Sequence, residues 1–345
     1  MEGPSADDAV SPWRPWQQAW AEALYGPAGF YRREAPADHF RTSAHASSLL
    51  GRALAQVAVE VDDHLGRPVR LDVVDVGAGR GELLLALAGA LPPELRARAA
   101  LTAVEVGPRP DGLDPAVAWT DRVPDDVSGL LIAHEWLDNV PCPVAEVDPA
   151  GAVRLVEVDP RNGRERLGGP LDDADRRWLV RWWPATEPGE RAEVGRPRDE
   201  AWAGVVSALH RGVALAVDYA HSRAERDAGS YADGTLAAYR LGRAAPPVPD
   251  GRSDLTAHVA LDACAAAGEE AGVTRTALLT QREALRRLGI TGSRPDTALA
   301  EADPRAYLLA LQEAAYAGEL LDPAGLGGFG WLVQAVGCPL PAAFG

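Results

Sequence analysis

A glycine-rich turn between two apolar runs, within residues 71–90, limits the folds open to this chain more than its other local patterns do. The first run, residues 71–76, is rich in valine, which is typical of a parallel strand covered on both faces. Three glycines follow it directly at alternate positions: Gly77, Gly79 and Gly81. Glycine permits a positive φ and lets a ligand approach the backbone, and residues 82–90 continue as a predicted helix. The pattern therefore predicts a ligand-binding turn between a strand and a helix.

The spacing of these glycines, and the acid before them, indicate the kind of ligand. A dinucleotide-binding turn reads G-x-G-x-x-G and holds a pyrophosphate at the start of its helix. This chain has G-x-G-x-G around Ala78, with Asp75 at the end of the strand. A carboxylate at that point repels a pyrophosphate but suits a cationic or hydroxyl-rich ligand. The spacing disfavours a nicotinamide oxidoreductase and leaves open a glycine turn that binds no cofactor.

Strand-like and helix-like segments alternate along most of the chain, which predicts an α/β fold with a mostly parallel sheet. Further strands are predicted at residues 101–106, 117–121, 129–133, 212–219, 273–280 and 329–336. Helices are predicted at residues 13–24, 48–65, 172–183, 200–210, 256–272, 282–288 and 304–321. Residues 144–147 and 152–158 form a predicted hairpin that interrupts this order, so residues 144–210 are interpreted as an insertion covering the active site. The polar residues 223–234 are predicted to be mobile.

Acidic residues follow several predicted strands, and ligands bind beyond the carboxyl ends of the strands in sheets of this kind. Glu105 lies at the end of the second strand, at roughly the 20-residue distance from the glycine turn that suits binding to ribose hydroxyls. Asp121 ends the third strand and is also assigned to the cofactor. His134, Glu135 and Asp138 follow the fourth strand, so we expect them to face the cofactor and to carry the chemistry.

Later segments supply further candidates for the cleft. Asp218 and Tyr219 end a predicted core strand, and Asp254 and His258 lie in a segment near residue 256. An acid at Asp254 could instead cap the helix predicted from residue 256, and we favour that reading slightly. Glu135 and its neighbours begin like the zinc-protease motif H-E-x-x-H but lack the second histidine, so no metal site is predicted.

Composition excludes several classes of protein. All 34 basic residues are arginine, which excludes a P-loop lysine, a Schiff-base lysine and a lysine general base. The net charge of −16 disfavours a nucleic-acid partner. The three cysteines, Cys142, Cys264 and Cys338, lack the spacing of a zinc site or a disulfide framework. No signal peptide or run of about 18 apolar residues is recognised, so we expect a cytoplasmic protein without a membrane segment.

Taken together, these segments resemble the MidA-like family of class I S-adenosylmethionine-dependent methyltransferases, which is related to the mitochondrial arginine methyltransferase that assists assembly of respiratory complex I. The resemblance runs from about residue 25 to residue 336. It rests on FRTS at 40–43, VGAGRGEL at 76–83, VE at 104–105, EWLDNVP at 135–141, VDY at 217–219, DLTAHV at 254–259, TQ at 280–281 and GLG at 325–327.

The resemblance implies a Rossmann-like sheet of about seven strands with the last strand antiparallel. It divides the chain into a helical N-terminal cover (1–65), a cofactor-binding half (66–143), a substrate-covering insertion (144–210) and a second half of the methyltransferase domain (211–345). It implies that Gly77, Gly79 and Gly81 meet the methionyl part of S-adenosylmethionine and that Glu105 meets its ribose. His39, Thr42 and His45 fall in the family's N-terminal motif and are assigned to the substrate.

The methyl acceptor stays open at this stage, because two acids of the family's N-terminal motif are replaced here by His39 and His45. A guanidinium, with a pKa of about 13.8, needs carboxylates to orient it and accept its proton, a task that suits Glu135 with Asp138. A hydroxyl or phenol could use a histidine base, for which His39, His45, His134 and His258 are candidates. The resemblance favours protein arginine, and a small-molecule acceptor remains open.

Two other readings remain beside the methyltransferase. Glu135 and Asp138 could simply cap a helix, as acids at helix starts commonly do. The chain could also be an inactive relative that binds the cofactor, or only a partner protein, in an assembly role. The oligomeric state is not indicated by the sequence.

Overall fold

The core of the protein is a seven-stranded sheet in the computed structural model, which describes residues 12–33 and 44–345. The strands lie in the order β14-β15-β10-β5-β2-β3-β4. Their bounds are β2 Leu71–Val76, β3 Ala99–Val104, β4 Ala118–Thr120, β5 Val127–His134, β10 Leu209–Asp218, β14 Arg275–Thr280 and β15 Gly330–Val336. Neighbours from β4 to β10 pair in parallel, while β15 runs antiparallel to both of its neighbours. The predicted fold class, including the antiparallel last strand, is confirmed.

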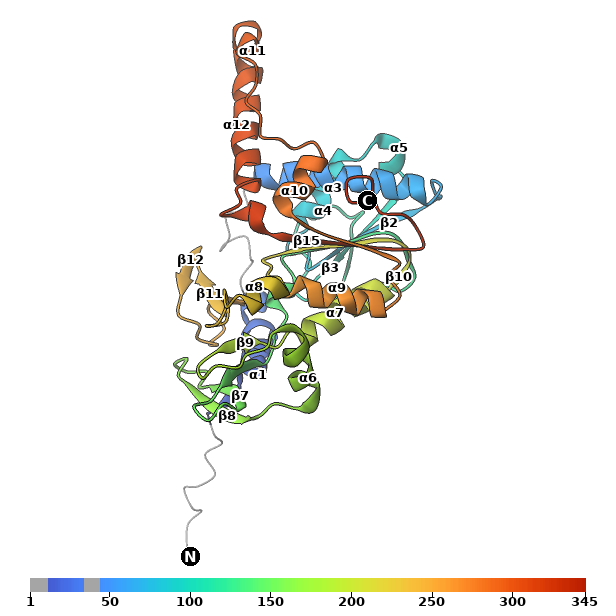
Figure 1. The fold of residues 1–345 in the computed structure, drawn as a ribbon. Helices are drawn as coiled ribbons and strands as arrows, with labels where there is room; N and C mark the ends of the chain where they lie inside the picture. Colours follow the sequence, from blue (N-terminus) through green and yellow to red (C-terminus); the bar gives the residue numbers. More distant parts are fainter. Residues whose placement is uncertain (1–11, 34–43) are drawn as a thin grey trace, which may run out of the picture.

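Helices cover both faces of this sheet (Figure 1). Because successive strand residues point to opposite faces, Val73 and Leu130 pack on one side and Val74 and Leu131 on the other. The first face is covered by α3 Ala44–His64, α4 Glu82–Ala90, α5 Pro93–Arg96, α10 Gln281–Arg287 and the base of α12 Pro304–Leu320. The second face is covered by α7 Arg196–Ser207 and α9 Leu261–Glu270. Burial on both faces explains the nearly continuous apolar strands.

A second sheet joins the N-terminal segment to the interrupting segment. It has the order β1-β7-β6-β9, with β8 on the outer side of β7. The bounds are β1 Arg14–Pro15, β6 Val144–Val147, β7 Val153–Val158, β8 Glu165–Pro170 and β9 Arg191–Glu193, with α6 Asp173–Trp182 beside them. Helix α1 Trp16–Tyr25 buries Trp16 and Trp20 against Val144 and Val158, as the aromatic spacing in residues 13–24 suggests. These two distant segments therefore form one unit (Figure 1).

Short elements complete the chain. They are α2 Phe30–Arg33, η2 Leu137–Asn139, α8 Arg223–Asp227, α11 Thr297–Ala302, η3 Leu326–Gly328 and the three-stranded sheet of β11 Ala237–Arg240, β12 Arg243–Ala245 and β13 Asp254–Thr256. Helices α11 and α12 project away from the sheet (Figure 1). No helix in the described part of the chain combines the length and apolar character that a bilayer-spanning segment requires.

Several predicted boundaries are wrong, each because a contact distant in sequence or a local cap decides the conformation. The helix predicted from residue 256 begins only at Leu261, because β13 pairs with β11, so Asp254 is a strand residue and not a helix cap. The segment 223–234, in which no helix is predicted, contains α8, which Ser222 starts with a capping box, while the mobility of the segment stays a prediction. The helix predicted at 200–210 lies at Arg196–Ser207, since β10 takes up the residues from Leu209.

One consequence of this packing can be tested with two glycines that both lie in helices. A Cβ at Gly268 in α9 would overlap the side-chain amide of Gln334, which is buried and held by Trp202 Nε1 at 2.7 Å. We expect Gly268→Ala to lower the free energy of unfolding by about 1–3 kcal/mol. Gly204→Ala in α7 meets no atom within 4 Å and should raise it by about 0.5–1 kcal/mol. Urea unfolding measures both, and equal stabilities would contradict this packing.

Candidate active site

A cavity of about 620 Å³ opens at the carboxyl ends of β2, β3, β5 and β10. Most of the site residues predicted from sequence line it. They are Asp75, Gly77, Ala78, Gly79, Glu105, Asp121, His134, Glu135, Asp138, Tyr219 and Asp254. The fold thus brings together residues that are up to 179 positions apart (75 to 254), at the edge where parallel sheets bind ligands.

The glycine turn after β2 forms one wall of the cavity. Gly77, Gly79 and Gly81 have φ values of +74°, +58° and +84°, a region that other residues adopt only with strain. A Cβ at Gly77 would lie 2.7 Å from Cδ1 of Trp136, so close packing also requires glycine there. At Gly79 a Cβ would meet no atom within 4 Å, so the turn leaves open space beside its backbone. Gly81 does not line the cavity and instead immediately precedes α4.

Glu105 closes the turn from the end of β3. Its Oε2 accepts a hydrogen bond from the N–H of Gly79 at 3.0 Å, and its Oε1 accepts from Val106 and Gly107 at 2.7 and 3.1 Å. An ionised carboxylate offers about four acceptor positions, so capacity for a further donor remains on the cavity side. A carboxylate held in this way suits a vicinal pair of ribose hydroxyls.

Asp75 lies almost completely buried at the end of β2, beneath the turn. Burial, reinforced by the nearby charges of Glu105 and Glu82, raises the pKa of Asp75 to about 7. A cationic ligand would compensate this cost and favour the ionised carboxylate. A sulfonium and an ammonium therefore fit this end of the cavity, whereas a pyrophosphate does not.

At the other end of the cavity, Glu135 follows β5 with a φ of +50°, a strained left-handed conformation for a residue with a side chain. Its N–H donates to the carbonyl of Val217 at 2.8 Å, which fixes this conformation. Burial, together with the charge of Asp138, raises the pKa of Glu135 to about 8. Backbone strain at a half-buried ionisable group on a cavity wall is characteristic of functional residues.

His134 precedes Glu135, and its Nδ1 lies 3.6 Å from Glu135 Oε1. Burial lowers the pKa of His134 to about 4, so the imidazole is neutral near pH 7. A group with such a low pKa is a weak proton acceptor at neutral pH. The low pKa of His134 therefore favours Glu135 over His134 as the base at this position.

Asp138 and Asp254 stand beside Glu135. The Oδ2 of Asp138 accepts a hydrogen bond from the hydroxyl of Thr256 at 2.6 Å, whereas Oδ1 is buried and has no hydrogen-bond partner within the described residues. Asp254 Oδ1 accepts from Tyr31 Oη at 2.9 Å and from Asn139 Nδ2 at 3.0 Å. Burial and the charge of Asp138 raise the pKa of Asp254 to about 8. This end of the cavity is thus acidic, and Oδ1 of Asp138 has no donor there among the described residues.

Two predicted site residues lie behind the wall of the cavity. Asp218 accepts hydrogen bonds from the N–H groups of Leu137 and Asp138 at 2.9 and 3.2 Å, and it supports the turn η2. The imidazole of His258 stacks on Tyr219, with ring centroids 5.8 Å apart. His39, Thr42 and the side chain of His45 lie outside the described residues.

The sequence interpretation missed several side chains on the cavity wall, most of them aromatic. They are Tyr25, Tyr31, Trp136, Asn139, Tyr239 and Thr256. The rings of Tyr25 and Tyr31 stack at 5.6 Å, and the aromatic content of residues 25–31 was the available signal. No residue of 144–210 is among the described side chains that line the cavity. The second sheet instead supports α1, which ends in Tyr25, from behind.

Comparison with known proteins agrees with this geometry. Residues 53–278 match a family described as "Putative S-adenosyl-L-methionine-dependent methyltransferase". A crystal structure of an uncharacterised superfamily protein from Burkholderia thailandensis has 26% sequence identity and a TM-score of 0.78, covering 96% of this chain and 90% of that one. A superfamily member from the same organism, bound to S-adenosylhomocysteine, has 26% identity and a TM-score of 0.77, covering 96% and 89%. No curated protein matches the sequence.

Because the match spans well over half of its length, the chain belongs to this family of S-adenosylmethionine-dependent methyltransferases. The resemblance to MidA-like methyltransferases is confirmed, and S-adenosylmethionine is the cofactor. Within the described ranges, no three His, Cys, Asp or Glu side chains are arranged to hold a metal ion.

The close packing of Trp136 on the turn can be tested through ligand binding. We expect Gly77→Ala to weaken binding of S-adenosylhomocysteine at least 10-fold, because the added methyl group displaces Trp136 or the turn. Gly66→Ala is the matched control, since Gly66 has a φ of +80° but no atom within 4 Å of an added Cβ. Calorimetry should show unchanged affinity for the control, and equal affinities for both variants would contradict the assigned wall.

The raised pKa of Glu135 also predicts a pH dependence of stability. An unfolded Glu ionises near pH 4.3, whereas folded Glu135 keeps its proton up to about pH 8. Between these pH values the native state binds one more proton at this residue than the unfolded state does, so the free energy of unfolding falls as pH rises. The contribution of protonated Glu135 to stability is complete below about pH 4 and is lost by about pH 8. Glu135→Gln should therefore flatten the fall in unfolding free energy between pH 5 and 8. Urea denaturation across this range measures it, and parallel curves would refute the raised pKa.

Proposed function

We propose that this protein transfers the methyl group of S-adenosylmethionine to a guanidinium nitrogen of arginine in a protein acceptor. The observation that carries the proposal is the buried, unpartnered Oδ1 of Asp138 on the cavity wall beside Glu135. A buried carboxylate oxygen without a donor is costly unless a ligand supplies one. A guanidinium presents several N–H donors in one plane and a positive charge, which matches two neighbouring carboxyl groups.

The cofactor would lie along the glycine turn. In this arrangement Gly77, Ala78 and Gly79 contact its methionyl part, and Asp75 lies beneath the turn to balance its positive charges. Glu105 accepts hydrogen bonds from the ribose hydroxyls. Asp121, beyond the end of β4, binds the cofactor farther along the same wall. Bound S-adenosylmethionine supplies a methyl group on a sulfonium, a good leaving group, so the protein's main tasks are alignment and exclusion of water.

The chain's own residues then act on the acceptor. Glu135 and Asp138 orient the guanidinium, and Glu135 accepts the proton that the nitrogen loses as its bond to the methyl carbon forms. The electrons of the broken carbon–sulfur bond stay on sulfur, which leaves S-adenosylhomocysteine. The rings of Tyr25 and Tyr219 flank the acidic end of the cavity and suit a flat cationic group.

A hydroxyl acceptor fits this wall less well than a cationic nitrogen. Among the described residues, the histidine on this wall that could serve a hydroxyl as base is His134, and with a pKa of about 4 it is a weak proton acceptor at neutral pH. The acidic wall also includes Asp254, which binds Tyr31 and Asn139. An amine or guanidine metabolite would bind the same carboxyl groups. The experiment below therefore distinguishes a small-molecule acceptor from a protein acceptor. The roles of His39, Thr42 and His45 in binding the acceptor remain part of this proposal.

The test is transfer of tritiated methyl groups from S-adenosylmethionine to a cell extract that is separated by size. We expect label in macromolecules, released by acid hydrolysis as methylated arginine. Label confined to small molecules would overturn the protein acceptor, and no label at all would favour an inactive assembly factor.

Glu135→Gln provides the matched variant for catalysis. It should reduce methyl transfer by at least about 100-fold, the scale of general-base catalysis, while S-adenosylhomocysteine affinity changes less than about 3-fold. In the wild type, transfer at low acceptor concentration should rise with pH towards the Glu135 pKa of about 8. Equal transfer by variant and wild type would remove Glu135 from the mechanism.

A further inference from the structure

A buried arginine behind the cavity, Arg198, donates its guanidinium hydrogen bonds to backbone carbonyls and, in the part of the chain that the structure describes, not to a carboxylate. Arg198 lies in α7 and is 1% exposed. Its guanidinium donates to three backbone carbonyls, those of Asp138 at 2.7 Å, His258 at 2.7 Å and Val140 at 3.1 Å. Among the contacts of the described residues, no carboxylate bonds to it. The guanidinium therefore binds main-chain carbonyl groups and forms no ion pair with the described residues.

The same short stretch of main chain is held from its other side by Asp218. Its Oδ2 accepts from the N–H groups of Leu137 and Asp138. The N–H groups of Leu137 and Asp138 are thus bound by a buried carboxyl oxygen, and the carbonyls of Asp138 and Val140 are bound by a buried guanidinium. This arrangement follows the direction of the peptide dipoles in the turn, so the two side chains stabilise the same backbone conformation.

Arg198 also joins the turn to the strand that carries the hydroxyl partner of Asp138. Through the carbonyl of His258 it holds the chain just after β13, and Thr256 of β13 donates to Asp138 Oδ2 at 2.6 Å. The N–H of Ala257 reaches the carbonyl of Asp138 at 3.3 Å, beside the Arg198 bond. The Cζ of Arg198 lies over the ring of Trp20 in α1, 5.7 Å from its centroid. One side chain therefore ties α1, α7, η2 and β13 together.

We propose that Arg198 and Asp218 form a clamp on residues 137–140 that positions the Asp138 carboxylate for the methyl acceptor. This inference rests on the proposed function. Neither residue lines the cavity, so both act through Asp138 and are positioning residues. Replacing Arg198 by an apolar side chain of similar length removes one charged donor from each of three main-chain carbonyls and lets the turn move.

The clamp also contributes an electrostatic effect that a purely structural contact lacks. The charged or ionisable groups that face Asp138 are Glu135, Asp218, Asp254, Tyr25, Tyr31, Tyr219 and Arg198. Burial raises the pKa of Asp138, and the Thr256 hydrogen bond and the Arg198 charge oppose that rise. Removing the charge of Arg198 should therefore raise the pKa of Asp138. Because ionised Asp138 as well as Glu135 orients the acceptor in the proposed mechanism, the acid side of the pH profile for methyl transfer should move to higher pH.

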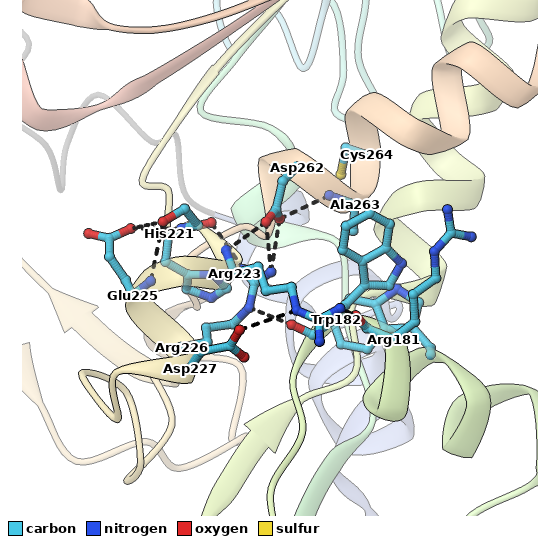
Figure 2. Close-up of polar contacts among 12 residues, drawn as sticks. Arg181, Trp182, His221, Arg223, Glu225, Arg226, Asp227, Asp262, Ala263 and Cys264 are labelled. Carbon is cyan, nitrogen blue, oxygen red and sulfur yellow. Dashed lines mark hydrogen bonds and ion pairs between the residues drawn. The ribbon is translucent and has the colours of Figure 1, made fainter.

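A second buried arginine offers a matched control (Figure 2). The side chain of Arg226 in α8 is fully buried, and it bonds to Asp262 at 2.9 Å, to the carbonyl of Trp182 at 2.8 Å and to His221. Figure 2 shows these contacts drawn together from α8, α9 and the end of α6. Arg226 does not line the cavity and does not touch residues 137–140. Arg226→Met therefore removes a comparable buried guanidinium elsewhere.

The experiment compares four variants with the wild type: Arg198→Met, Arg198→Lys, Asp218→Asn and Arg226→Met. It is carried out at a temperature at which urea titration shows that every variant is folded. Hydrogen exchange is followed in peptides spanning 135–141, and tritiated methyl transfer to the fractionated extract is followed across pH 6 to 9. We expect Arg198→Met to speed exchange in 135–141, to reduce transfer at least 10-fold and to raise the pH of half-maximal transfer. S-adenosylhomocysteine affinity should stay within about 3-fold. Asp218→Asn should also speed exchange, and Arg198→Lys should recover part of the transfer and the wild-type pH profile.

Arg226→Met should speed exchange in α8 and keep both exchange in 135–141 and transfer within 2-fold of the wild type. The clamp is overturned if Arg198→Met exchanges and transfers like Arg226→Met, or if its pH profile is unmoved. The proposed function fails in a different way, since the wild type itself would then show no transfer although it binds S-adenosylhomocysteine. Exchange in 135–141 distinguishes the two failures, because it needs no acceptor.

Discussion

Burial of carboxyl groups around one cavity is the constraint on which the rest of this site depends. Each carboxylate removed from water favours either a proton or a cation, and Asp75, Glu135 and Asp254 all have pKa values raised by burial. The cofactor of the family brings a sulfonium and an ammonium, and a guanidinium acceptor would bring a third positive group. The acidic wall is therefore complementary to the positive charges of the cofactor and of the proposed acceptor. Without these ligands, the unfavourable burial of the carboxylates appears as raised pKa values.

The fold places these buried carboxyl groups near the carboxyl ends of the parallel strands, where neighbouring strands hold the backbone. The parallel strands end together, and the turns that follow them take their backbone partners from neighbouring strands, as Gly77 does from Val104 and Glu135 from Val217. The sheet itself is packed on both faces by apolar side chains, with Asp75 near the carboxyl end of β2 and Glu135 just beyond that of β5. Stability and chemistry are thus separated along the strand direction.

Much of this could be predicted from sequence where the pattern is local. The bounds of β2 and α4 agree with residues 71–76 and 82–90, because period, glycines and proline all act within a few residues. The position of Asp254 could not be predicted, because β13 exists only through pairing with β11. Arg198 was likewise hidden, since its partners lie about 60 residues away on either side in sequence. Aromatic residues 25–31 carried a usable signal, whereas Tyr239 in its small sheet carried none.

The left-handed backbone of Glu135 has a consequence for how relatives of this protein diverge. A side chain in that conformation costs of order 1 kcal/mol, and glycine or asparagine would relieve most of it. Folding alone does not favour a glutamate there, whereas the proposed role of its carboxyl group does. A descendant that had abandoned the chemistry and kept the scaffold would be free to drift to glycine or asparagine there. The residue at this one position thus records whether a lineage still depends on the carboxyl group.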